Sequence, residues 1–176
     1  MARCRPAESV SVFFVAGLTE GEVTMYLFAV LIGIVAGSRT FTAPAAASWA
    51  ARLGHLDLGG TWLAFMGYAW TPWVFTALAL VEMVIDQLPS TPSRLVPMQF
   101  GARLVSGAVS GASVVGTTGS IVGGALVGIL GAVIGTFGFH ALRRKLAAAF
   151  GRDKPAAFIE DALAIGGAFL IIVGLR

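Results

Sequence analysis

The sequence predicts an all-α protein, a polytopic bundle of transmembrane helices. Of its 176 residues, 57% are hydrophobic and 12% are charged, whereas soluble domains average roughly 45–50% apolar and about 25% charged residues. The mean hydropathy is +0.86. Glycine occurs 23 times, nearly twice the usual frequency of roughly 7%. So few charged side chains are not enough to cover the surface of a water-soluble protein of this size. The lipid bilayer is therefore the environment that fits this chain.

The composition also excludes several kinds of site. The single cysteine, Cys4, allows no internal disulfide and no multi-thiolate metal site. The two histidines, His55 and His140, lack metal-ligand spacing. The net charge of +3 comes from basic residues between apolar runs, which is typical of membrane orientation signals. We therefore expect no metal, no cofactor and no nucleic-acid partner.

Residues 1–24 differ from the rest of the chain, because charged residues flank a short apolar patch there. A signal peptide would place small residues after that patch, whereas Thr19, Glu20 and Glu22 follow it. We expect residues 1–24 to form a tail outside a single membrane domain, 25–176. Met25 is an alternative start, since the strong hydrophobic signal begins there.

A membrane span needs about 20 apolar residues, and the sequence predicts about five spans. Arg39 and Pro44 interrupt the first, and the proline weakens the helical ladder, so a broken first span is compatible with the pattern. Aromatic residues dominate 61–70, which fits the headgroup level. Loops are expected at 89–94 and 146–154. The predicted spans are 25–50, 71–88, 99–115, 119–141 and 155–175.

The basic residues predict an orientation, because cytoplasmic loops carry an excess of lysine and arginine. With five spans and a cytoplasmic loop at 143–154, the N-terminus is cytoplasmic and the C-terminus lies on the opposite side. An even number of spans stays open if 61–70 inserts or the first span is re-entrant. Arg52 and Arg176 then lie outside. The basic residues inside are Arg3, Arg5, Arg94, Arg103, Arg143, Arg144, Lys145, Arg152 and Lys154.

Charged residues within spans are candidates for a functional site, because each costs about 2.5–3.5 kcal/mol on insertion scales. Arg39 follows Met25 by 14 residues, or roughly 21 Å of helix. Glu82 and Asp86 are four residues apart and face one side of their helix, where neighbouring carboxylates can share a proton or hold a cation. Straight helices would keep Arg39 and Glu82 roughly 10 Å apart along the membrane normal, so a tilted or broken first span is needed to join them.

A second pair of acids, Glu160 and Asp161, follows Pro155 near the start of the last span, and Arg103 is a candidate partner for it. Each group also has a structural interpretation. Arg39 can snorkel or bind carbonyls freed near Pro44. Acids near a helix N-terminus favour the helix dipole. For Asp86 the structural interpretation is a solvated position at a helix end, and for Glu82 it is an ion pair with an arginine.

Glycines at small-xxx-small spacing predict helices that pack closely. They also favour a homo-oligomer or a partner within a membrane complex. The predicted packing positions are Gly33, Gly37, Gly119, Gly123, Gly124, Gly128, Gly131 and Gly135.

Several short motifs occur in a familiar order, and together they resemble the bacterial membrane proteins grouped as domain of unknown function 4126. The resemblance covers about residues 26–175 and implies a polytopic inner-membrane protein, without an established activity, substrate or cofactor. Two positions depart from the family pattern: Gln87 stands where lysine is common, and Leu104 where proline is common. The motifs are Gly37-Ser-Arg-Thr-Phe-Thr-Ala-Pro44, Ala51-Arg-Leu-Gly54, Glu82-xxx-Asp86-Gln-Leu-Pro89, Gly101-Ala-Arg103 and Glu160-Asp161.

These observations lead to a functional hypothesis, a small secondary transporter or ion-coupled permease for a small ion or solute. Glu82 would accept a proton or cation, and Arg39 would serve as its counter-ion or as an anion anchor. The alternative is a structural or accessory subunit of a membrane complex. An enzyme, for example a lipid-processing one, is not expected, since Walker, HExxH and nucleophile-elbow motifs are absent. The expected binding site comprises Arg39, Glu82, Asp86, Arg103, Glu160 and Asp161.

Overall fold

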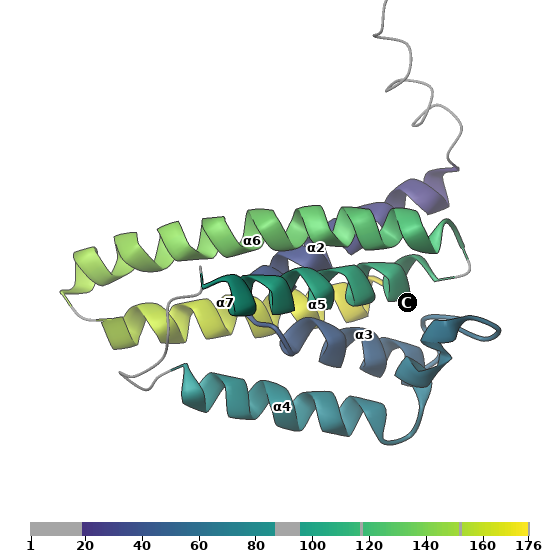
Figure 1. The fold of residues 1–176 in the computed structure, drawn as a ribbon, viewed down its shortest axis with the longest axis horizontal. Helices are drawn as coiled ribbons and strands as arrows, with labels where there is room; N and C mark the ends of the chain where they lie inside the picture. The colour runs from purple at the N-terminus through teal and green to yellow at the C-terminus, as the bar shows by residue number, and fades with distance from the viewer. Residues whose placement is uncertain (1–18, 87–95, 117, 152, 176) are drawn as a thin grey trace, which may run out of the picture.

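The computed structural model describes residues 19–86, 96–116, 118–151 and 153–175, with the backbone alone for 153 and 154. Within these ranges all regular structure is helical, as predicted (Figure 1). Most of the predicted tail, the loop at 89–94, Arg152 and Arg176 lie outside the described residues. The elements are α2 (Glu20–Ser38), α3 (Thr42–Arg52), the 3-10 helix η1 (Trp62–Gly67), α4 (Thr71–Ile85), α5 (Pro97–Val115), α6 (Ile121–Phe150) and α7 (Asp153–Gly174).

The helix α2 begins at Glu20, before the predicted domain boundary at residue 25. Thr19 caps α2, accepting a hydrogen bond from the backbone N–H of Glu22, while the Glu22 carboxylate accepts one from the backbone N–H of Thr19. This reciprocal capping box satisfies two N–H groups that the first helical turn leaves without partners. Residues 20–24 therefore belong to α2 and not to a tail outside the membrane domain.

The predicted first span, 25–50, is two helices. α2 ends at Ser38, and Arg39 has extended backbone angles (φ −137°, ψ 117°). α3 begins at Thr42, so Pro44 falls in its first turn, where a missing N–H is tolerated. Figure 1 shows α3 running back in the opposite direction, between α5 and α4, and the chain is therefore reversed at residues 39–41.

The helices alternate in direction. Gly33 and Gly37 of α2 face Gly128 and Ala132 of α6, so these two helices are parallel, whereas Gly174 at the end of α7 lies beside Phe28 near the start of α2. The beginning of α2 and the end of α7 are therefore at the same end of the bundle (Figure 1). This arrangement does not confirm the prediction of five spans with the N- and C-termini on opposite sides of the membrane. The physical reason is the reversal at residues 39–41, which divides the predicted first span into two helices of opposite direction.

Three helices are long and apolar enough to cross a membrane: α2, α6 and residues 155–174 of α7. α4 is apolar but shorter. α5 carries several polar side chains, and it packs against α2, α3 and α6, so its second half is buried. The structure thus supports a membrane-embedded helical bundle in which α5 is shielded by its neighbours.

Glycine allows the helices of the centre to approach closely. A Cβ added to Gly128 would meet the carbonyl group of Gly107 on α5, and one added to Gly33 would meet the backbone of Gly128. Gly37, Gly131 and Gly135 are equally close to the backbone of a neighbouring helix. Larger residues at these positions would separate α6 from α2 and α5, the helices that position the charged groups described next.

α4 is the outer helix of the bundle. Trp49 of α3 donates to the hydroxyl oxygen of Thr76 at 3.1 Å and stacks edge-on against Trp73. Pro72 and Ala79 are the buried residues of this helix. Most of its large apolar side chains are exposed, as expected for a helix that faces lipid.

Candidate functional site

Arg39 lies at the helix break and is almost completely buried, with 1% of its side chain exposed. Its Nη1 donates to Oδ2 of Asp86 at 2.6 Å, and its Nη2 donates to Oδ1 of Asp161. The guanidinium therefore joins the end of α4 to the first half of α7. A buried ion pair compensates its desolvation only when hydrogen bonds hold both partners, and here one cation contacts two carboxylates.

Glu82 accepts hydrogen bonds from backbone N–H groups, whereas the sequence predicted it as a proton or cation acceptor with Arg39 as its counter-ion. Its Oε1 accepts from the backbone N–H of Thr40 at 2.7 Å, and its Oε2 accepts from that of Phe41 at 2.9 Å. Phe41 is the N-cap residue of α3 and has no side chain able to cap the helix. The carboxylate of Glu82 supplies this cap from α4, at the positive end of the α3 dipole.

Arg103 provides the complementary interaction at the end of α2. Its Nη1 donates to the carbonyl oxygens of Gly37 and Ser38, at 2.5 and 2.7 Å. Thr136 also donates to the oxygen of Gly37, at 3.2 Å. The last carbonyls of a helix lack intrahelical donors, and a cation is favourable at that end of the dipole. Arg103 is only 2% exposed, so these carbonyls replace water as its partners.

The carbonyl of Thr40 is a further backbone group of the break that a side chain holds. Thr40 precedes Phe41, the N-cap residue of α3, so its carbonyl lies outside the hydrogen-bond ladder of that helix. The hydroxyl of Ser106 donates to this carbonyl, at 2.5 Å. The break is thus held from α4 by Glu82 and from α5 by Arg103 and Ser106.

Glu160 is next to Asp161 but faces another partner. It is 1% exposed, and its Oε2 lies 3.7 Å from Nη1 of Arg143 on α6. The adjacent acids of α7 therefore connect to two helices, with Asp161 on Arg39 and Glu160 on Arg143. At 3.7 Å the guanidinium of Arg143 and the carboxylate of Glu160 form an ion pair.

In the charged cluster formed by Arg39, Asp86 and Asp161, two buried polar atoms lack a hydrogen-bond partner among the described residues: Nε of Arg39 and Oδ2 of Asp161. One is a donor and the other is an acceptor. Buried polar atoms are nearly always paired with protein or ordered water. Nε of Arg39 can therefore donate to a water molecule, and Oδ2 of Asp161 can accept from one. Alternatively, Oδ2 of Asp161 can take up a proton.

A pocket of about 250 Å³ lies beside the cluster, between α4 and α5. Its polar wall contains Glu82, Asp86, Arg103 and Gln99, and its remaining wall is mostly apolar. Mixed walls of this kind suit small molecules, which bind mainly by apolar contact and are oriented by a few polar groups. Thr40 and Phe41 also line this pocket, so a ligand bound in it would lie beside the helix break.

The structure places five of the six predicted site residues at the helix break and pairs the sixth elsewhere, and it adds partners that were not predicted. Of the six predicted site residues, Arg39, Asp86 and Asp161 are in direct contact, Glu82 and Arg103 hold the two sides of the break, and Glu160 pairs with Arg143. Ser106, Thr136 and Arg143 were missed as site residues. Polar side chains within glycine-rich helices were the available signal for the first two.

In the described part of the chain, no group of three or more histidine, cysteine, aspartate or glutamate side chains is arranged to hold a metal ion. No protein-family model, curated protein or solved structure matches this sequence. The resemblance to domain of unknown function 4126 therefore stays a prediction.

Proposed function

We propose that this protein is a small ion-coupled permease in which the charged cluster at the α2–α3 break carries a proton. The observation that supports this proposal is a discontinuous helix whose buried arginine contacts two carboxylates beside a pocket of about 250 Å³. Transporters commonly form their binding sites from discontinuous helices, whose ends present unpaired backbone groups to ions and substrates.

Asp161 is the proton carrier in this proposal. When a proton binds to its Oδ2, a new O–H bond forms and the charge of the carboxylate is lost, which leaves Arg39 paired with Asp86. When the proton leaves to water, Asp161 is again an anion beside Arg39. Glu82 is less suited to this task than we expected from the sequence, because both of its oxygens already accept backbone N–H groups.

We further propose an orientation for the bundle. Arg143, Arg144 and Lys145 lie in the last part of α6, and this end faces the cytoplasm under the positive-inside rule. The beginning of α2 and the end of α7 then face the opposite side of a bacterial inner membrane. This places the start of α2 outside, in contrast to the cytoplasmic N-terminus expected from five spans.

Proton flux into liposomes tests the permease. The full chain is reconstituted with a pH-sensitive dye inside and a potassium diffusion potential across the membrane. We expect acidification faster than in protein-free liposomes, and we expect Asp161→Asn to abolish it. Glu20→Gln, a neutralised acid at the exposed start of α2, is the matched control and should retain the flux. A wild-type rate equal to that of protein-free liposomes overturns the proposal.

An accessory subunit is the second candidate, and the contacts of Glu82 and Arg103 favour it. Both side chains stabilise the break through backbone groups, as a purely structural role requires. Under this hypothesis the protein co-purifies from its native membrane with a partner at fixed stoichiometry and shows no flux alone. Flux from the isolated chain that Asp161→Asn removes contradicts it.

A further inference from the structure

The hydroxyl groups of α5 lie on one face of that helix. Ser106, Ser110 and Ser113 are spaced by four and three residues, which places them within one narrow arc of an α-helix. Arg103 is three residues before Ser106 and belongs to the same arc. Because Arg103 and Ser106 contact the end of α2 and the start of α3, this hydroxyl face is directed toward the helix break.

Ser110 differs from the other buried hydroxyl groups. It is completely buried, with 0% of its area exposed, and its Oγ has no hydrogen-bond partner among the described residues. Ser48, Ser113 and Thr136 each donate to a carbonyl three or four residues earlier in their own helix. A buried hydroxyl that does not take this local partner is expected to serve another one, most simply water.

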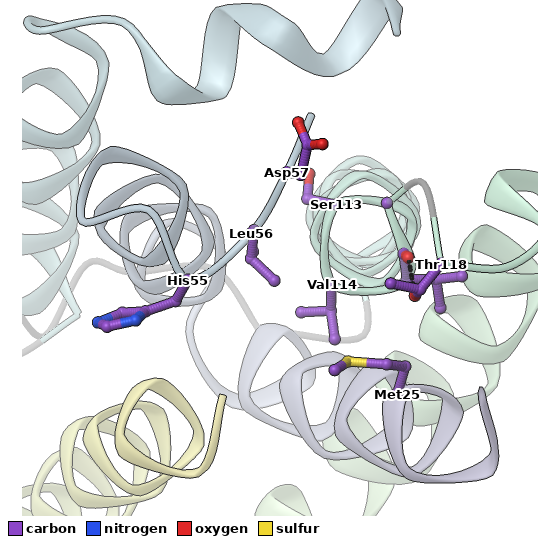
Figure 2. A pocket seen from close by; sticks show the side chains of 9 residues that line it. Met25, His55, Leu56, Asp57, Ser113, Val114 and Thr118 are labelled. Carbon is purple, nitrogen blue, oxygen red and sulfur yellow. Dashed lines mark hydrogen bonds between the residues drawn. The ribbon is translucent and has the colours of Figure 1, made fainter. Parts of the chain in front are cut away.

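The hydroxyl face joins two features of the structure. At one end, Ser106 donates to the carbonyl of Thr40 within the break. At the other end, Ser113 lines a second pocket of about 30 Å³, together with Asp57 and Thr118 (Figure 2). A cavity of roughly 10–15 Å³ already accommodates a water molecule. This pocket lies between the start of α2, the segment after α3 and the end of α5, at the end of the bundle opposite to Arg143.

The spacing of the serines fits single water molecules. Ser106 and Ser110 are separated by four residues, or about 6 Å along the helix axis. A water that bonds to both hydroxyls at about 2.8 Å spans roughly 5.6 Å. Ser110 and Ser113 are closer, about 4.5 Å along the axis. One water in each interval would therefore give a continuous chain of hydrogen bonds between the small pocket and the break.

We propose that Ser106, Ser110 and Ser113 form the route by which water and protons reach the Arg39 cluster from the small pocket. This inference rests on the proposed permease and supplies its second access path, since the larger pocket between α4 and α5 lies beside the cluster already. In the conformation described here the route is closed at Ser110, which has no exposed area. Alternating access requires one closed path while the other is open.

Cysteine accessibility tests the route without reference to transport. Cys4 is the only cysteine of the sequence, so Cys4→Ser gives a background free of other thiols. Ser110→Cys and Ser113→Cys are then exposed in liposomes to a small, water-soluble, positively charged thiosulfonate. Ala112→Cys is the matched control, because Ala112 is buried on the same helix, 1% exposed, and lies off the serine face. The extent of modification is followed by intact-protein mass spectrometry.

We expect both serine positions to react at least about tenfold faster than Ala112→Cys, a ratio equivalent to about 1.4 kcal/mol. Equal rates at Ser110→Cys and Ala112→Cys overturn the route. Ser110→Ala provides a second measurement: if the route carries protons, this variant folds normally and its proton flux falls by about tenfold, again about 1.4 kcal/mol in the barrier. Unchanged flux in a folded Ser110→Ala protein contradicts the route as well.

The two experiments separate the route from the permease. Fast modification of Ser110→Cys in a protein without proton flux supports the water path and overturns the permease. Wild-type flux combined with slow modification of Ser110→Cys supports the permease and overturns this route. Slow modification without flux overturns both.

Discussion

Asp161 binds Arg39 across 122 positions of the chain, and the second oxygen of Asp161 has no partner among the described residues. The contact therefore does two things at once. It closes the bundle by joining α7 to the end of α2, and it leaves one carboxylate oxygen for a proton or a water molecule. Substitutions of these residues and of their neighbours separate the contribution of such contacts to stability from their contribution to the proposed transport.

Replacing Arg39 should destabilise the fold severely. In Arg39→Gln the carboxylates of Asp86 and Asp161 lose their shared cation in a buried site, which typically costs about 3–5 kcal/mol. Thermal unfolding of the detergent-solubilised protein measures the effect. Arg52→Gln, an exposed arginine at the end of α3, is the matched control and should unfold like the wild type. An Arg39→Gln protein of wild-type stability would contradict the buried ion pair.

Glu82→Gln should cost stability even though glutamine has nearly the same shape. The amide has one acceptor oxygen, so it serves only one of the two N–H groups of Thr40 and Phe41. A fully buried donor left without a partner costs about 1–3 kcal/mol, and because these two N–H groups are part-buried we expect a loss at the lower end of that range. Denaturant unfolding monitored by tryptophan fluorescence should show the loss, and Glu20→Gln should not. If Glu82→Gln removes proton flux and leaves stability unchanged, Glu82 is a proton carrier rather than a helix cap.

Alanine at Gly128 should separate the central helices. Its Cβ would meet the carbonyl group of Gly107, backbone that cannot move without shifting α5. Overpacking of this kind typically costs about 1–3 kcal/mol. Gly138→Ala is the control on the same helix, because nothing lies within 4 Å of its Cβ position. We expect Gly138→Ala to be neutral or slightly stabilising in thermal unfolding; equal losses from both variants would show that α6 is not closely packed at Gly128.

The orientation predicts a labelling pattern in intact cells. In the Cys4→Ser background, Thr118→Cys between α5 and α6 should react with a membrane-impermeant maleimide added outside. Ala149→Cys near the end of α6 should react only after the inner membrane is permeabilised. The reverse pattern would invert the orientation, and external labelling at both positions would contradict a membrane crossing by α6.

The all-helical class of fold was predictable from the sequence, and the proximity of most of the charged residues has one physical reason. In a chain with so few charges, each buried one must be paired, and Arg39, Asp86 and Asp161 satisfy that requirement together. The pairing itself was not predictable, because Glu82 and Asp86 share one face of a helix and differ only in depth. Pro44 indicated that the first span could break, but the reversal of α3 follows from contacts with Glu82, Arg103 and Ser106 that lie far away in sequence.

The groups that stabilise the helix break come from α4, α5 and α7, and the last of them is supplied by the final helix of the chain. Asp161 follows Arg39 by 122 positions, so it is synthesised after the other groups that contact the break. The charged cluster is therefore completed only by α7, and a chain that ends before α7 has Asp86 beside Arg39 but lacks the second carboxylate.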